Sequence, residues 1–250
     1  MTFGVRHEWD RLREAAIGSA PALGELLKRS GVTVHRLDWP APRDPLIVVG
    51  THLIEASLRF ENRQHERFAL RPLAQQLAQR GDARWSSVPP GWANGVDGPF
   101  LEGGDVLLNG REIYVGMSGR ASDMAGIDWL GSMLGKEHKV VPVAMRSSVR
   151  HLEDVLALVR PGLLIACPDL LIDGLPTALR SWDAITLSQE EAGQRMAHLL
   201  VLEPGGVVVD TGNVRVGNEL RARGIEVAAL PFAEGLRAAH LALWRESERE

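Results

Sequence analysis

The chain has 250 residues, of which 45% are hydrophobic and 24% are charged, a composition typical of a globular protein and not of a disordered one. The formal net charge is −4 and no run of Lys or Arg stands out, so nucleic acid and membrane partners are not expected. The single cysteine, Cys167, excludes an intramolecular disulfide framework and a zinc site built from cysteines. No apolar run approaches the length of a membrane-spanning helix. We therefore expect a cytoplasmic protein that forms one domain over residues 1–250.

Short apolar runs bounded by turn residues predict buried strands along the whole chain. The first covers residues 45–50. A hairpin is expected over residues 105–116, because Asn109-Gly110 supplies the positive φ angles that a tight turn needs. Further strands are expected over residues 162–167, 198–202 and 205–210.

Helical spacing of apolar residues occurs between these strands. Residues 66–80 predict one helix, with a buried face made of Phe68, Leu70, Leu73 and Leu77. Residues 122–134 predict a second helix with Ser122 as its N-cap. Two more helices are expected over residues 150–159 and 217–224. Strand pairs that alternate with single helices indicate an α/β architecture with short connections.

Four polar clusters lie at strand ends or helix starts, where α/β proteins tend to place their sites. They are residues 43–45 (Arg-Asp-Pro), 100–105 (Phe-Leu-Glu-Gly-Gly-Asp), 150–154 (Arg-His-Leu-Glu-Asp) and 234–240 (Glu-Gly-Leu-Arg-Ala-Ala-His). The two glycines of the second cluster let the backbone pass close to another group. Taken singly, each cluster has an ordinary interpretation, such as a turn at Asp44 or a cap at His151. Cys167 lies in an apolar strand and is expected to be an inert thiol.

Together these clusters supply several carboxylates and a histidine but no evident nucleophile. Paired carboxylates are the natural bidentate partners of a guanidinium group, because its planar fork of donors matches their oxygens. The set therefore suggests a site for a cationic, planar substrate.

The order and spacing of the clusters resemble the glycine and inosamine amidinotransferases, within the guanidino-group-modifying pentein superfamily. The stretches that point to amidinotransferases are Glu-Trp-Asp-Arg-Leu-Arg-Glu (8–14), Pro-Arg-Asp-Pro-Leu-Ile-Val-Val-Gly (42–50), Ile-Glu-Ala (54–56), Phe-Ala-Leu-Arg-Pro-Leu (68–73) and Gly-Ile-Asp-Trp-Leu (126–130). Leu-Glu-Gly-Gly-Asp (101–105) and His-Leu-Glu (151–153) are similar to motifs of the whole superfamily, which includes arginine deiminases and dimethylarginine dimethylaminohydrolases.

This resemblance implies a pentein fold, an α/β propeller of five ββαβ modules around a pseudo-fivefold axis, with the site in its central channel. It also implies a mechanism without a metal or an organic cofactor, in which a cysteine thiolate attacks the guanidinium carbon. His151 is the implied acid–base residue, oriented by Glu102. Asp44 and Glu153 are the implied clamps on the guanidinium nitrogens, and Arg237 is implied to bind substrate.

The sequence departs from the family pattern at the nucleophile. The family motif Gly-Gly-Gly-x-His/Arg-Cys-x-Thr/Ser matches residues 233–240 and places Ala238 at the cysteine position. An alanine methyl cannot attack carbon, so this chain is predicted to be inactive by the family route. Two interpretations stay open: an engineered cysteine-to-alanine change in a competent enzyme, and a natural homologue that has lost or replaced the chemistry. The arginine that grips the donor carboxylate in glycine amidinotransferases falls at Leu170.

Further departures leave the substrate open. Glu153 stands where the family usually has Asp. The resemblance also implies that Asp105, as a member of the Gly-Gly-Asp turn, is a structural residue rather than a catalytic one. We expect specificity to lie in loops at the channel mouth, over residues 86–99 and 189–195.

The predicted function is the binding of a guanidino compound, with a wild-type reaction that moves an amidino group from an arginine-like donor to an amine acceptor. The alternatives are a guanidine hydrolase, a non-catalytic guanidine-binding protein, and a reaction carried out by His151 and the carboxylates alone. Exposed propeller edges allow a homodimer without requiring one.

Overall fold

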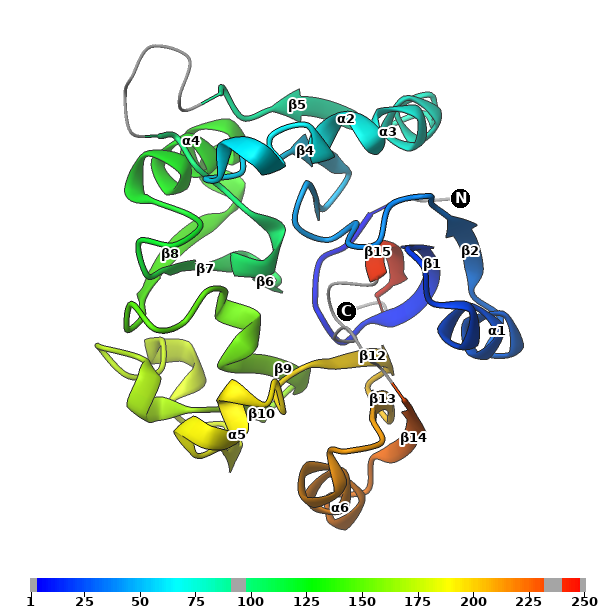
Figure 1. The fold of residues 1–250 in the computed structure, drawn as a ribbon, viewed down its shortest axis with the longest axis vertical. Helices are drawn as coiled ribbons and strands as arrows, with labels where there is room; N and C mark the ends of the chain where they lie inside the picture. Colours follow the sequence, from blue (N-terminus) through cyan, green and yellow to red (C-terminus); the bar gives the residue numbers. More distant parts are fainter. Residues whose placement is uncertain (1–3, 91–97, 232–239, 248–250) are drawn as a thin grey trace.

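The computed structural model describes residues 4–90, 98–231 and 240–247, and in them fifteen strands form five three-stranded sheets arranged as a ring (Figure 1). The first sheet joins the two ends of the chain and the other four follow in sequence order. The sheets are β15 (His240–Glu246), β1 (Arg11–Ile17) and β2 (Thr33–Arg36); β3 (Leu46–Val49), β4 (His52–Glu55) and β5 (Arg84–Ser87); β6 (Val106–Asn109), β7 (Glu112–Met117) and β8 (Lys139–Ala144); β9 (Leu156–Arg160), β10 (Leu163–Ala166) and β11 (Asp183–Thr186); and β12 (Leu199–Glu203), β13 (Gly206–Asp210) and β14 (Glu226–Leu230).

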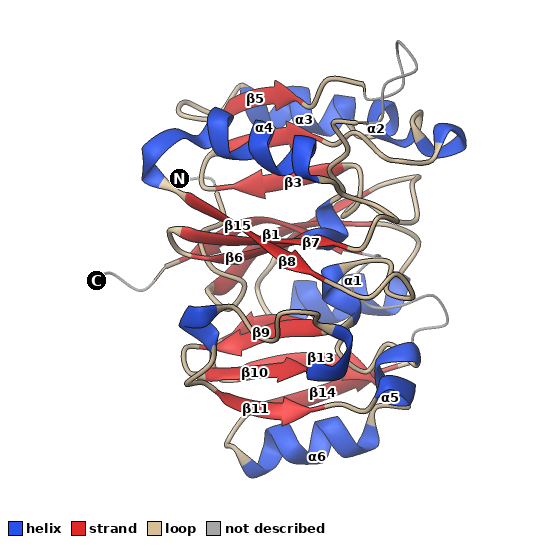
Figure 2. Cartoon of the chain, turned by 90° about the vertical axis from the view of Figure 1, so that its left-hand side faces the viewer, coloured by secondary structure: helices blue, strands red, loops and turns tan. Residues whose placement is uncertain are grey.

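Every sheet has the same pairing pattern. The middle strand is antiparallel to one neighbour and parallel to the other, as β4 is to β3 and to β5. A parallel pair needs a crossover, and helices provide it in four modules. These are α1 (Pro21–Arg29), α2 (Glu66–Ala69) with α3 (Arg71–Ala78), α4 (Met124–Leu134) and α6 (Val214–Ala222), while two 3₁₀ turns serve between β10 and β11 and α5 (Gln189–Gly193) connects β11 to β12. The long helices lie at the periphery of the ring (Figures 1 and 2).

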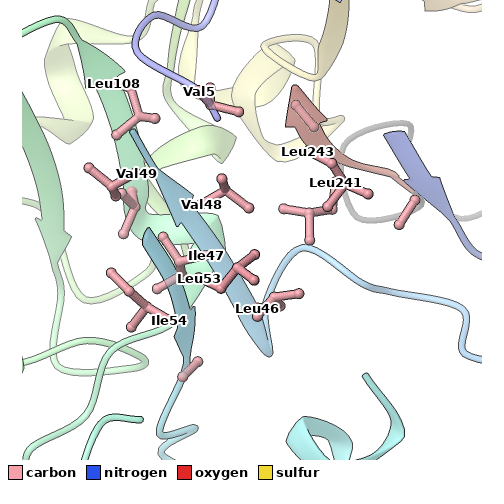
Figure 3. Packing of buried hydrophobic residues seen from close by; sticks show 14 of the residues in the cluster. Val5, Leu46, Ile47, Val48, Val49, Leu53, Ile54, Leu108, Leu241 and Leu243 are labelled. Atoms are coloured by element: carbon pink, nitrogen blue, oxygen red, sulfur yellow. The ribbon is translucent and has the colours of Figure 1, made fainter. Parts of the chain in front are cut away.

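Buried apolar side chains join neighbouring modules. Figure 3 shows Leu46 and Val48 of β3 gathered with Leu241 and Leu243 of β15 and with Val5. One buried cluster lies mainly in the first three sheets and a second mainly in the last two. The described helices include none that is both long enough and apolar enough to span a membrane.

The predicted strands are confirmed as β3, β10, β12 and β13, and the predicted hairpin as β6 and β7. Its turn has Gly110 at φ 62°, the left-handed conformation expected there. The helix predicted over residues 217–224 is α6, which begins three residues earlier, at Val214.

The helix predicted over residues 150–159 is wrong. Leu152–Asp154 form a single 3₁₀ turn and β9 follows directly. Every side chain from Val155 to Val159 is buried, which a helix with one solvent face would not require. A continuous apolar run of this length is a fully buried strand.

Two other helix predictions need correction. Residues 66–80 form two short helices, because Pro72 lacks an N–H and lies in the first turn of α3, which begins at Arg71. Phe68 is 53% exposed instead of buried. The helix over residues 122–134 begins at Met124, and its N-cap is Asp123, whose carboxylate accepts the Gly126 N–H at 2.9 Å. Ser122 is buried, and its hydroxyl oxygen accepts the N–H of Glu102 at 3.0 Å.

Candidate active site

Three segments that lead into the first strands of consecutive modules meet at one cavity. Asp44 lies two residues before β3, Glu102 precedes the turn into β6, and His151 and Glu153 lie in the turn before β9. Asp44, His151 and Glu153 line a cavity of about 580 Å³. The repeated module thus brings together four side chains that are far apart in the sequence.

His151 lies between two of the carboxylates. Its Nε2 atom is 2.9 Å from Glu102 Oε2, and its Nδ1 atom is 3.9 Å from Asp44 Oδ1. Burial acts to lower the pKa of His151, but Asp44, Glu102 and Asp105 outweigh it and raise the pKa to about 10. The imidazole is therefore protonated at neutral pH and can donate a proton to a departing amine.

The two glycines of residues 101–105 allow these segments to touch. A Cβ atom on Gly103 would lie 1.9 Å from the carbonyl oxygen of Arg43, and one on Gly104 would lie 2.7 Å from the ring of His151 and 2.9 Å from Asp44 Oδ1. No side chain fits at either position without moving backbone or site atoms. The close approach predicted from the sequence is thus an approach to the site itself.

Asp105 connects the turn over residues 102–105 to the segments that contain Ser122 and Leu152. Its buried carboxylate accepts the backbone N–H of Ser122 at 2.9 Å and that of Leu152 at 3.0 Å. Burial raises the pKa of Asp105 to about 7. These contacts hold the Glu102 turn against the His151 turn, which is a structural role.

Two arginines for which the sequence predicts no role in the site, Arg63 and Arg43, lie against its carboxylates. Arg63 Nη2 donates to Asp44 Oδ2 at 2.9 Å, and Arg63 Nη1 donates to Glu102 Oε2 at 3.3 Å. Arg43 Nε lies 2.7 Å from Glu153 Oε2. Asp44 Oδ1 is buried and has no hydrogen-bond donor among the described residues. Arg43 lies in the Pro-Arg-Asp stretch, so the sequence motif could have identified it as a site residue. Arg63 lies in a 3₁₀ turn, Glu61–Arg63, that matches none of the motifs, so the sequence offered no such indication.

The rest of the cavity wall is partly basic. Arg150 and Arg195 line it, and Leu170, the position of the family's carboxylate-binding arginine, lines it as well. His198 also lines it, with Nε2 2.8 Å from Asp154 Oδ1. His198 directly precedes β12, the strand that corresponds to β3, β6 and β9, so the modular repeat would have identified it.

Two predicted site residues, Arg237 and Ala238, lie outside the described residues, as does part of the predicted loop over residues 86–99. The other predicted loop, residues 189–195, contributes Gln189 and Arg195 to the cavity wall. Cys167 is fully buried just after β10, and burial raises its pKa, which disfavours the thiolate form that a nucleophile needs.

Asp44, His151 and Glu153 also offer three potential metal-ligand atoms within 4.8 Å of one another. Metal ligation needs a neutral imidazole, so a metal ion would have to displace the proton that the raised pKa of His151 holds there. The Arg43 guanidinium already lies 2.7 Å from Glu153. The chemistry of this donor set therefore fits a cation that donates hydrogen bonds better than a metal ion.

No family model matches the chain. A Streptomyces griseus protein named as an inosamine-phosphate amidinotransferase is 29% identical over 266 residues, which cover 88% of this chain and 76% of that protein. The L-arginine:L-lysine amidinotransferase of Pseudomonas savastanoi pv. phaseolicola is 28% identical over 166 residues, 58% of this chain and 45% of that protein.

Solved structures show the same architecture. The inosamine-phosphate amidinotransferase from Streptomyces griseus superimposes with a TM-score of 0.88 at 22% identity, over 100% of this chain and 99% of that one. The dimethylarginine dimethylaminohydrolase from Pseudomonas aeruginosa gives 0.76 at 16% identity, over 94% of this chain and 100% of that one. The chain therefore has the pentein fold, with its five ββαβ modules. The two sequence relatives are named as amidinotransferases, and the similarity to them covers 88% and 58% of this chain.

Proposed function

We propose that the chain binds a guanidino compound in the cavity lined by Asp44, His151 and Glu153. The observation that carries this proposal is the buried oxygen Asp44 Oδ1, which accepts no hydrogen bond from the described residues and lies beside the His151–Glu102 pair. A buried acceptor without a donor costs free energy, and an N–H of a bound guanidinium would satisfy it. The contact of Arg63 with the other oxygen of Asp44 supports the match, because it is itself a guanidinium–carboxylate contact.

The wild-type reaction that we propose is amidino transfer from an arginine-like donor to an amine, which the names of the sequence relatives support. A cysteine thiolate at position 238 would form a C–S bond to the guanidinium carbon, and the C–N bond to the leaving amine would break as His151 gives that amine a proton. The acceptor amine would then attack the same carbon and return a proton to the imidazole as the thiolate departs. Ala238 removes this nucleophile, so the present chain should bind without turnover.

A second candidate is a guanidine hydrolase, in which water takes the place of the acceptor amine. Its support is the fold shared with a dimethylarginine dimethylaminohydrolase whose structure was determined with citrulline bound. A third is a non-catalytic or chemically diverged binding protein, which the alanine at position 238 favours if it is native.

Binding is tested by titrating the unaltered chain with arginine in a calorimeter. We expect saturable binding that Asp44→Asn weakens by about tenfold or more, because a charge-assisted hydrogen bond is lost. Asp82→Asn, on an exposed turn, is the matched control and should bind as the unaltered chain does. No saturable binding, or equal binding by both variants, would contradict the proposal.

The reaction is tested by Ala238→Cys, assayed with arginine in the presence and absence of added amines. Product that depends on the amine would identify a transferase, and amine-independent citrulline or urea would identify a hydrolase. Binding without any product from the thiol-restored variant would leave the binding protein as the function.

A further inference from the structure

Arg63 holds the carboxylates in the way a ligand guanidinium would. Its two terminal nitrogens bridge Asp44 and Glu102, the acids on either side of His151, at 2.9 and 3.3 Å. The Arg63 side chain is 17% exposed and lines the cavity, so it stands at the wall that a ligand would approach. A second guanidinium could reach Asp44 Oδ1 but not the oxygens that Arg63 already occupies.

Arg63 also has a second partner that does not belong to the site. Glu66, three residues further along, accepts from Arg63 Nε at 2.5 Å and from Nη2 at 2.8 Å. Nη2 is thus shared between Glu66 and Asp44. Arg63 can therefore release Asp44 and remain paired through its fork with Glu66, so its own charge stays paired when it leaves the site.

We infer that Arg63 is an internal guanidinium ligand, which competes with the bound guanidino compound for Asp44 and sets the affinity of the site. This inference rests on the function proposed above. The apparent affinity for a ligand is reduced by the fraction of molecules in which Asp44 is available. Because Arg63 is tethered, its effective concentration at the site is high, on the order of millimolar. A small guanidinium with no second contact is therefore displaced more readily than a larger guanidino compound with additional contacts in the cavity.

The test compares Arg63→Met with the unaltered chain, using methylguanidinium and arginine as calorimetric probes. Methionine keeps an unbranched stem at this position, but it is shorter than arginine and carries neither the charge nor the donors. We expect methylguanidinium to bind about tenfold more tightly to Arg63→Met than to the unaltered chain. The affinity for arginine should increase by a smaller factor. Arg36→Met, which removes an exposed arginine paired with Glu25, is the matched control and should bind as the unaltered chain does.

Glu66→Gln should act in the opposite direction. Without the Glu66 carboxylate, Arg63 loses its partner outside the site and keeps only Asp44 and Glu102, so it stays on Asp44 and both probes should bind more weakly than to the unaltered chain. An effect of the same sign for Arg63→Met and Glu66→Gln would overturn the inference.

Arg63→Met leaves buried carboxylates without their cation, so Arg63→Lys is made in parallel to keep the charge without the fork. Arg63→Lys should bind methylguanidinium more tightly than the unaltered chain does, but by a smaller factor than Arg63→Met. Equal or weaker binding by folded Arg63→Met or by Arg63→Lys would overturn the inference and leave the proposed function intact. If the unaltered chain and both Arg63 variants bind neither probe, the proposed function itself fails.

Discussion

At the residue scale, the site is an array of buried charges of both signs. Asp44, Glu102 and Glu153 each have an arginine or the His151 imidazole within hydrogen-bond or ion-pair distance. Buried charges are tolerated when they are paired in this way, and removal of one partner leaves the other uncompensated. Burial acts against ionisation of Asp44, but His151 and Arg63 outweigh it and lower its pKa.

Asp105 is different, because its hydrogen-bond partners are backbone N–H groups, and its pKa is raised to about 7. A carboxyl group with a raised pKa in the folded state holds its proton there longer than in the unfolded chain. Its contribution to the free energy of unfolding is therefore full below about pH 4 and is lost as the pH rises to about 7, a loss of roughly 4 kcal/mol.

Urea unfolding from pH 4 to pH 8 checks this prediction. The curve for Asp105→Asn should lack the decline between pH 4 and pH 7, so the slopes are compared and not the absolute stabilities. Asp82→Asn, at an exposed turn, should keep the slope of the unaltered chain. A decline of the same size in Asp105→Asn would contradict the assignment.

At the element scale, the N-terminus of α4 is fixed by the side chain of Asp123. Asp123 caps α4 and also accepts the N–H of Phe100 at 3.0 Å, so one carboxylate holds both the helix and the segment that leads to Glu102. Asp123→Ala should lower the free energy of unfolding by about 1–2 kcal/mol. Asp128→Ala, on the exposed face of the same helix, should change it by less than about 0.5 kcal/mol. Chemical denaturation measures both, and equal effects would refute the assignment of the cap.

The sequence predicts elements best where the signal is local. The predicted hairpin is confirmed, and Gly110 opens its turn with a positive φ, whereas Asn109 is the last residue of β6 and pairs with Glu112. Residues 150–159 mix two signals, since the polar residues at 151–154 suit a helix start and the apolar run that follows suits a buried strand. Sequence periodicity cannot decide between them, because the environment that buries β9 on both faces comes from other modules.

The same limit applies to the site. The resemblance supplied Asp44, Glu102, His151 and Glu153, and the structure brings these four side chains together. Arg63 could not be predicted, because its partners Asp44 and Glu102 are 19 and 39 residues away in the sequence. Such pairings depend on how the modules pack, which no local pattern encodes.

At the scale of the whole molecule, the ring is closed by the two ends of the chain. β15 pairs antiparallel with β1, and Arg245 of β15 donates from Nη1 to the carbonyl oxygens of Asp10 at 2.6 Å and Val201 at 2.9 Å. The buried Arg245 side chain thus connects the closing strand to the N-terminal segment and to β12. We therefore expect the site segments before β3, β6 and β9 to stay around one cavity only while this ring is closed.

Arg245→Met should therefore destabilise the whole molecule. Two buried carbonyl oxygens lose a charged donor, which predicts a loss of about 3 kcal/mol in the free energy of unfolding. Arg13→Met is the matched control in the same sheet, because Arg13 pairs with Glu246 at the exposed surface, and it should cost less than about 1 kcal/mol. Thermal and urea unfolding measure both variants, and arginine binding measures the site. Since Arg245 closes the ring, its replacement should weaken binding and stability together; a stable Arg245→Met protein with unaltered binding would show that closure does not depend on this side chain.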